Sequence, residues 1–134
     1  THAFASFLGI IAQLTKAYVY LGIAEGALKA AQNYTTTQTR PWITSGVNHI
    51  TQDPYILHHY GELWAQLQAA IALADQTAIA AQTAWDKDIN LTPEERGEVA
   101  ISVFATKVTA TRVGLEITNR IFELMGSRAT ATHF

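Results

Sequence analysis

The sequence predicts an all-α fold, an up-down antiparallel bundle of three long helices over about residues 4–39, 54–85 and 93–125. Two observations predict it. Within each stretch, apolar residues recur every three or four positions, which gathers them on one helical face. The prolines, at positions 41, 54 and 93, all fall where a helix is expected to end or begin. Three helices alone leave one seam of a four-helix bundle open, so we expect a fourth helix from sequence beyond this chain, another domain or a second subunit.

The expected first helix is apolar over most of its circumference. Lys16 lies in the middle of its apolar run, and Glu25 and Lys29 follow, so we interpret it as a buried helix of a soluble protein and expect no membrane partner. Its main face is predicted to contain Phe7, Ile11, Leu14, Tyr18, Leu21 and Leu28, widened by Ile10, Ala17, Ala24, Ala27 and Ala31.

A loop of about residues 41–53 is expected after this helix. Pro41 disfavours the helical conformation at Arg40, which places Arg40 at the C-terminus of the first helix. Trp42 and the isoleucines of the loop predict that it is packed. Loops of this length in compact domains are often functional.

The expected second helix begins at Asp53 and Pro54, an N-cap followed by proline in the first turn. It is expected to run to about Trp85, and a short polar turn then returns the chain into the third helix. Its predicted buried stripe contains Leu57, Tyr60, Leu63, Trp64, Leu67, Ile71, Leu73, Ala74, Ala78 and Ala81.

The expected third helix has a complete start signal: Thr92 as N-cap, Pro93 at the first position and Glu95 as the partner in a capping box. It is expected to end at Gly126 as a left-handed C′ residue, which gives about 34 residues and roughly 50 Å. One predicted face contains Val99, Val103, Ala110, Val113, Ile117 and Leu124, and another contains Ile101, Phe104, Val108, Leu115 and Phe122. Two apolar faces imply two packing surfaces.

Composition limits the classes of partner. Residues 1–134 are enough for one domain, and the charged fraction of 15% is below the roughly 25% usual for soluble domains. A thinly charged surface predicts that another domain or another copy of the chain covers part of it, so we expect a homo-oligomer. The net charge of −2 without a basic cluster argues against nucleic acid as a partner. The absence of cysteine excludes disulfides and thiolate metal sites, and fits a cytoplasmic protein.

No compact catalytic set stands out in the sequence. The Glu-x-x-His pairs of a di-iron bundle are missing. His58 and Glu62 are four residues apart and could share a metal, but such a pair is more often solvated or hydrogen-bonded. His49 is more readily explained as a packed or surface histidine than as an acid or base. We therefore predict no metal site and assign no catalytic residue in this chain.

Two arginines occupy special places. Arg40 closes the first helix, and Arg128 follows the Gly126 turn in a segment that offers backbone N–H groups and the Thr130 hydroxyl. An arginine fork with such donors suits a phosphate or pyrophosphate. The simpler alternatives are that Arg40 caps a helix C-terminus and that Arg128 is a surface charge.

Three regions of the sequence carry a resemblance to a known family. They are residues 21–28 (LGIAEGAL), residues 39–63 with their TRPW, DPY and YGEL segments, and residues 121–130 (IFELMGSRAT). Together they resemble the C-terminal helical domain of the acyl-CoA dehydrogenase superfamily, most closely its flavin-dependent monooxygenase branch, the dibenzothiophene monooxygenase-like enzymes. The resemblance covers nearly the whole chain.

The resemblance implies a cofactor site shared between domains and subunits. In it, Arg40 matches an arginine that reaches the flavin phosphate across a subunit interface, and Arg128, Ala129 and Thr130 match a loop that touches the cofactor, FMN or FAD. The family fold also implies a dimer or tetramer of a longer enzyme with a small-molecule substrate. The Arg-Pro-Trp corner at Arg40 favours the monooxygenase branch. The family's catalytic glutamate or histidine would lie beyond Phe134, and His133 does not match it.

The resulting hypothesis is that this chain is the C-terminal helical domain of a larger flavoprotein oxidoreductase, a reduced-flavin monooxygenase, inactive as an isolated segment. Two alternatives stay open at this point. One is the corresponding domain of an acyl-CoA dehydrogenase that oxidises acyl-CoA thioesters. The other is a non-catalytic helical module for self-association.

Overall fold

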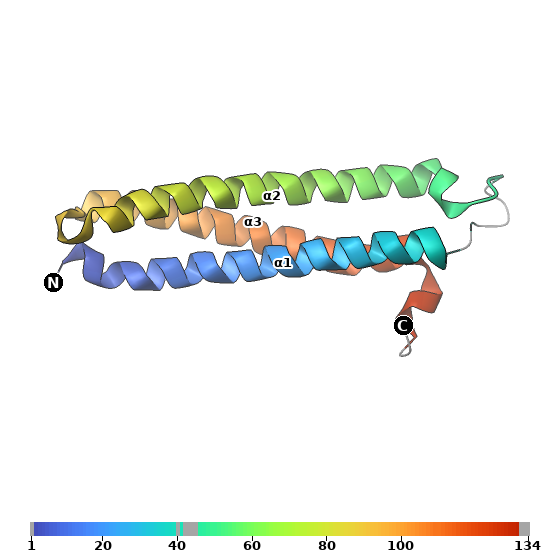
Figure 1. Ribbon diagram of the computed structural model, residues 1–134, viewed down its shortest axis with the longest axis horizontal. Coiled ribbons are helices and arrows are strands. Elements are labelled where there is room, and N and C mark those ends of the chain that lie inside the picture. The colour runs from blue at the N-terminus through green and yellow to red at the C-terminus, as the bar shows by residue number, and fades with distance from the viewer. Residues whose placement is uncertain (1, 40, 42–45, 132–134) are drawn as a thin grey trace.

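The computed structural model describes residues 2–39, 41 and 46–131, except the side chain of Arg128. Three long helices, α1 (Phe7–Thr37), α2 (Pro54–Asp86) and α3 (Pro93–Met125), lie side by side and alternate in direction along the chain (Figure 1). No strand occurs among the described residues. The predicted all-α, up-down bundle of three long helices is therefore confirmed. Short 3-10 helices flank the long ones: η1 (Ala3–Ser6), η2 (Ile50–Gln52), η3 (Asp88–Asn90) and η4 (Ser127–Thr130).

The buried positions follow a heptad repeat. In α1 they are separated alternately by three and four residues, as Phe7, Ile10, Leu14, Ala17, Leu21, Ala24, Leu28, Ala31 and Thr35. The same alternation runs along α2 from Leu63 to Ala84, and along α3 with one interruption between Ile117 and Ile121. A heptad repeat averages 3.5 residues per turn, so helices that keep it wind slightly around one another to stay in contact.

This repeat corrects part of the predicted faces. Tyr18, Leu57 and Trp64 were predicted to be buried, but they are 37%, 55% and 59% exposed. Each side chain directly follows a buried residue in the sequence. A pattern of 3.6 residues per turn would place it on the face toward the core, whereas the heptad repeat places it at the edge of that face. The Tyr18 hydroxyl instead donates to Asp75 Oδ1 of α2 at 2.7 Å. The other members of the predicted α1 and α2 faces are buried or half-buried.

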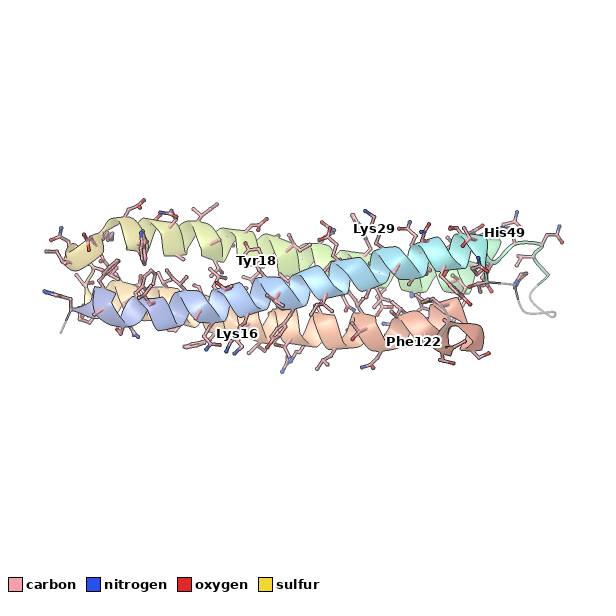
Figure 2. The ribbon with its side chains drawn as sticks, turned by 60° about the horizontal axis from the view of Figure 1, so that its bottom comes forward. Lys16, Tyr18, Lys29, His49 and Phe122 are labelled. Carbon is pink, nitrogen blue, oxygen red and sulfur yellow. The ribbon has the colours of Figure 1, made fainter. Side chains whose placement is uncertain are left out.

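Helix α3 has one covered and one uncovered apolar face. Every residue predicted for its first face is buried. The five residues predicted for its second face are between 46% and 72% exposed: Ile101, Phe104, Val108, Leu115 and Phe122. Phe122 lies near the end of the bundle where His49 is also found (Figure 2). The second predicted packing surface of α3 is thus uncovered in the single chain.

Helix starts match their sequence signals. Thr92 and Glu95 form the predicted capping box: the Glu95 N–H donates to Thr92 Oγ1 at 3.2 Å, and the Thr92 N–H donates to Glu95 Oε2 at 3.0 Å. Asp53 Oδ1 accepts from the Tyr55 N–H at 2.9 Å, which confirms the predicted N-cap of α2. Each interaction satisfies an N–H group that the first turn of a helix leaves without a partner.

The end of α3 differs in detail from the prediction. Gly126 follows the last helical residue and has a positive φ of 89°, as expected for a glycine stop. Its ψ of 169° lies outside the left-handed helical region, so the predicted left-handed cap is wrong. This combination of angles is essentially restricted to glycine, and it directs the chain away from the helix axis rather than around it.

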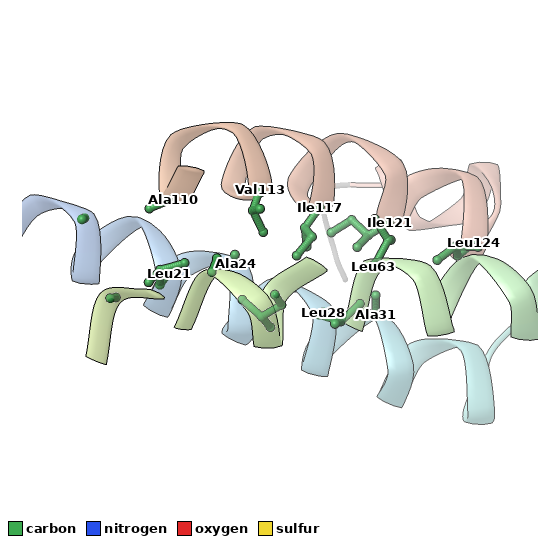
Figure 3. Close-up of a cluster of buried hydrophobic side chains, with 14 of the residues drawn as sticks. Leu21, Ala24, Leu28, Ala31, Leu63, Ala110, Val113, Ile117, Ile121 and Leu124 are labelled. Atoms are coloured by element: carbon green, nitrogen blue, oxygen red, sulfur yellow. The ribbon is translucent and has the colours of Figure 1, made fainter. Parts of the chain in front are cut away.

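The core is mostly apolar: among the described residues, its buried polar side chains are those of Thr35, Thr77 and Thr106. Its larger cluster joins all three helices and is lined by leucine, isoleucine and alanine side chains (Figure 3). A second cluster fills the end that contains both η1 and η3. Between the ends, the buried Thr77 and Thr106 hydroxyls of α2 and α3 are 2.8 Å apart and hydrogen-bonded. The Thr106 hydroxyl also bonds to the Ser102 carbonyl at 2.8 Å.

The residues from Ala3 to Thr37 are apolar and long enough to cross a membrane, judged by length and composition alone. In this fold, their heptad positions face α2 and α3, and the charged residues Lys16 and Lys29 lie at separate points along α1 (Figure 2). The packing agrees with the interpretation of this segment as a bundle helix. In the following loop Ile50 is 2% exposed, as predicted for a packed anchor, whereas Trp42 lies outside the described residues.

Candidate functional site

Two of the segments singled out in the sequence meet at one end of the bundle. Because α1 and α3 run in the same direction, both of their C-termini lie at this end, together with the N-terminus of α2 (Figure 1). The hydroxyl of Thr39, just beyond α1, donates to the carbonyl oxygen of Met125, the last residue of α3, at 2.7 Å. The corner that precedes Arg40 and the turn that precedes Arg128 are thereby joined directly.

The turn after α3 is compact and partly exposed. The Ala129 N–H donates to the Gly126 carbonyl at 3.1 Å, and the Thr130 hydroxyl donates to the Ser127 carbonyl at 2.8 Å. Ser127 and Thr130 are exposed, and Ala129 is half-buried. Ala129 and Thr130 are thus available to a neighbouring group, and their predicted cofactor contact stays a prediction. Arg40 and the side chain of Arg128 lie outside the described residues, so their predicted roles stay predictions too.

A charged network joins α2 and α3 near the end of the bundle that carries this turn. Arg120 Nη1 donates to Glu116 Oε1 at 2.9 Å and to Glu62 Oε1 at 3.3 Å. Arg120 Nη2 is also hydrogen-bonded to His59 Nδ1. The hydrogen bond to Glu116 is the main reason that the pKa of the Arg120 guanidinium is raised. One arginine therefore engages three side chains from two helices.

A tyrosine extends this network toward the end of α3. The Tyr55 hydroxyl, in the first turn of α2, donates to Glu123 Oε1, and this bond raises the pKa of the phenol. Tyr55 also packs its ring edge-on against His59, with the ring centroids 4.2 Å apart. Glu123 lies two residues before Met125, so the bond ties the start of α2 to the last turn of α3.

The network also bears on the metal alternative. His58 Nε2 lies 3.8 Å from Glu62 Oε2, but the other Glu62 oxygen is paired with Arg120. Among the described residues, no group of three histidine, aspartate and glutamate side chains is arranged to hold a metal ion. The pair is therefore explained as part of an ion-pair network. Sequence reasoning noted the His58–Glu62 spacing but missed the network, because the contacts of Arg120 with Glu62 and His59 join two helices about 60 residues apart in the sequence.

An open apolar cavity of about 300 Å³ lies between α1 and α2 at the same end. The exposed side chains of Leu57 and Trp64 help to line it. On one wall, the Thr35 and Tyr60 hydroxyls are 2.6 Å apart, and burial raises the pKa of the Tyr60 phenol. The cavity marks the seam that the three helices leave open.

Comparison with known proteins identifies the family. The family described as "Acyl-CoA dehydrogenase, C-terminal domain" matches residues 14–133. This chain belongs to that family. The resemblance drawn from the sequence is confirmed. The segments that contain Arg40 and Arg128 therefore both lie in a domain of the acyl-CoA dehydrogenase type.

The relatives in this acyl-CoA dehydrogenase C-terminal family include monooxygenases. Dibenzothiophene monooxygenase of Mycolicibacterium goodii is 49% identical over 125 residues, which cover 93% of this chain and 30% of that protein. The probable FMNH2-dependent monooxygenase SfnC of Pseudomonas putida is 45% identical over 127 residues, which cover 95% of this chain and 32% of that protein. The chain thus spans about a third of the length of these relatives.

Solved structures agree with the sequence relatives. The methanesulfinate monooxygenase MsuC from Pseudomonas fluorescens superposes with a TM-score of 0.95 and 45% identity, over 97% of this chain and 34% of that one. FMN-bound TdsC from Paenibacillus sp. A11-2 superposes with a TM-score of 0.92 and 42% identity, over 97% of this chain and 32% of that one. Members with this fold therefore include an enzyme whose FMN complex is known.

Proposed function

We propose that this chain is the C-terminal helical domain of a larger reduced-flavin monooxygenase, in which it helps to bind FMN and to join subunits. The observation that carries the proposal is the Thr39–Met125 hydrogen bond, because it brings the two segments expected to contact flavin to one end of one domain. FMN is preferred over FAD because one relative is named as FMNH2-dependent and another was solved with FMN.

In this proposal Arg40 and Arg128 supply positive charge to the cofactor site, and the turn after α3 supplies a surface against which the cofactor lies. Arg40 holds the flavin phosphate of a neighbouring subunit through a charge-assisted contact, and Arg128, Ala129 and Thr130 lie against the cofactor. The described residues fit such a role: the turn is partly exposed, is compact because of two internal hydrogen bonds, and has exposed Ser127 and Thr130 side chains. An exposed turn offers one wall rather than an enclosed pocket, so the rest of the enzyme must supply the others.

The catalytic group and the substrate pocket belong to the parts of the enzyme outside this chain. A small-molecule substrate is supported by a relative that was crystallised with indole. The family's name keeps acyl-CoA dehydrogenation as the alternative, but the named relatives are monooxygenases. The two activities differ in how flavin is reduced, by a separate reductase or by the acyl-CoA thioester itself.

Subunit assembly is proposed for the uncovered apolar surfaces. The exposed face of α3 and the open seam between α1 and α2 together present large aliphatic and aromatic side chains to solvent. Contiguous surfaces of this kind mark interaction sites in soluble proteins. We propose a homo-oligomer, a dimer or tetramer in the cytoplasm, with a fourth helix or a second subunit in the seam.

The test is flavin binding by the full-length enzyme. FMN and FAD, oxidised and reduced, are titrated into the wild type and into Arg40→Ala and Arg128→Ala. We expect each substitution to cost about 1–3 kcal/mol of FMN binding, the range for hydrogen bonds to charged groups. Arg112→Ala is the matched control, because Arg112 is exposed on α3 about 20 Å before the turn, at 1.5 Å per residue.

Each outcome has a meaning. Tighter binding of reduced FMN, with no reduction of the flavin by acyl-CoA thioesters, supports the monooxygenase. Unchanged affinity in both arginine variants contradicts the residue assignments. A parent protein that binds no flavin would leave self-association as the function of this domain.

A further inference from the structure

The hydroxyl of Thr39 makes an unusual connection for the end of a helix. It reaches the main-chain carbonyl of Met125, a residue 86 positions away, and the bond is partly buried. Of the threonine hydroxyls before it, those of Thr36 and Thr37 both donate to the Asn33 carbonyl within α1, at 2.9 and 2.8 Å. The Thr35 hydroxyl bonds to the Tyr60 hydroxyl of α2, whereas Thr39 bonds to the main chain at the end of α3.

The acceptor of this bond, the Met125 carbonyl, lies where the chain leaves α3 and changes direction. The last carbonyl groups of a helix have no partner within the helix, so the Met125 carbonyl is free to be fixed from outside. This carbonyl belongs to the peptide unit that joins Met125 to Gly126. The N–H of the same unit donates to the Phe122 carbonyl at 3.0 Å, so the planar unit is held from within α3 on one side and by Thr39 on the other.

The residue after that peptide unit is Gly126, and as a glycine it has few steric restraints on its backbone angles. Gly126 adopts φ 89° and ψ 169°, and a Cβ placed there would meet nothing within 4 Å, so no neighbouring side chain crowds this conformation. The turn beyond it is internally bonded from the Gly126 carbonyl to Ala129 and from the Ser127 carbonyl to Thr130. A compact turn on a permissive glycine moves as a unit unless the peptide unit before it is held.

We propose that Thr39 is a positioning residue for the cofactor-contacting turn of residues 127–130. It acts by fixing the Met125 carbonyl and, through it, the direction of the chain at Gly126. The inference rests on the proposed function, since it assigns a cause to the placement of Arg128, Ala129 and Thr130. It also couples the corner at Arg40 to the turn, because Thr39 directly precedes Arg40.

The experiment compares three variants of the full-length enzyme. Thr39→Val removes the hydroxyl and keeps the shape, Thr39→Ser keeps the hydroxyl, and Thr37→Val removes a neighbouring hydroxyl that bonds only within α1. FMN affinity is measured by titration, and the melting temperature is measured without flavin. We expect Thr39→Val to weaken FMN binding by roughly 3–10-fold, in the range of one hydrogen bond. Thr39→Ser and Thr37→Val should bind within about 2-fold of the wild type, and the melting temperatures should be alike.

A double-mutant cycle tests the route of the effect. If Thr39 acts through the turn, Thr39→Val should weaken FMN binding less in a protein that already contains Arg128→Ala than in the wild type, because only the contacts of Ala129 and Thr130 remain to be displaced. Additive effects in this cycle would overturn the inference, and so would normal FMN binding by Thr39→Val or a failure of Thr39→Ser to restore it.

The failure of the proposed function has a different signature. In that case the wild-type enzyme would bind no flavin, or Arg128→Ala would bind FMN as tightly as the wild type does. Either result would remove the basis of the inference. Weak binding by Thr39→Val together with a loss of its melting transition would show a general structural defect and would also overturn it.

Discussion

The two ends of this bundle are built differently. At the end that contains η1 and η3, aromatic rings close the core: Phe7 is fully buried, and the Phe4 and Trp85 ring centroids are 4.9 Å apart. At the other end, polar contacts join the helices around the apolar core: Thr39 to Met125, Tyr55 to Glu123, and Arg120 to its partners. Apolar burial tolerates small shifts, whereas hydrogen bonds fix atoms in place. The difference indicates that the aromatic end stabilises the fold and the polar end positions groups.

The largest effect is expected from a substitution that disrupts the aromatic end. Phe7→Ala deletes a ring that is 0% exposed and should lower the free energy of unfolding by about 3–5 kcal/mol, measured by urea unfolding with circular dichroism. FMN affinity of the folded protein should be unchanged. Leu8→Ala is the control, because Leu8 is 61% exposed and its loss should cost less than about 0.5 kcal/mol. Equal losses in the two variants would show that the aromatic cluster does not stabilise this end.

A smaller effect is expected from replacing the glycine at the polar end. Gly126→Ala forces a side chain into φ 89° and ψ 169°, which should cost about 1–3 kcal/mol of stability or displace the turn and weaken FMN binding. Gly97→Ala is the same substitution inside α3, where a Cβ also meets nothing within 4 Å. It should stabilise the protein by about 0.4–1 kcal/mol. The same sign at both positions, measured by urea unfolding, would contradict the role assigned to the Gly126 conformation.

The smallest effect concerns pH at the aromatic end. The Lys87 ammonium, 2.6 Å from Glu95 Oε1, and the Thr92 N–H lower the pKa of the Glu95 carboxyl. A lowered pKa means that Glu95 stabilises the folded state above the ordinary carboxyl pKa of about 4.5 and that this stabilisation is lost as the pH falls further. Glu95→Gln should therefore melt lower than the wild type at pH 7, and the gap should narrow on acidification below pH 4.5. Glu94→Gln, which changes a charge outside the capping box, should show a smaller gap at pH 7.

Local signals explain why the helices were predictable from the sequence. Proline positions, the Asp53 cap and the Thr92–Glu95 capping box each act within four residues, so helix starts can be read from neighbouring residues. Burial was predicted less well. A pattern with 3.6 residues per turn and one with 3.5 differ by about 20° per heptad, enough to misplace Tyr18 and Trp64 at the rim of the core.

The site was only partly predictable for a different reason. Its two segments were recognisable because each arginine lies next to a residue that ends a helix, Pro41 after Arg40 and Gly126 before Arg128. The contact between the segments was not, because a threonine hydroxyl and a backbone carbonyl 86 residues apart leave no pattern in the sequence. The Tyr55–Glu123 bond is similar, since neither residue indicates the other. Long-range polar contacts depend on how the helices align, which only the fold determines.

That alignment has a determinant in the middle of the bundle. The buried positions of α1 and α2 carry an alanine in nearly every heptad, and such repeated small side chains do little to fix the register of a neighbouring helix. The buried Thr77–Thr106 bond does not repeat: a shift of α3 by one heptad would separate the two hydroxyls by about 10 Å and leave Thr77 without this partner in the core. The bond therefore fixes the register of α3 relative to α2. It sets how far α3 extends along α2, and hence whether Glu123 arrives within reach of Tyr55.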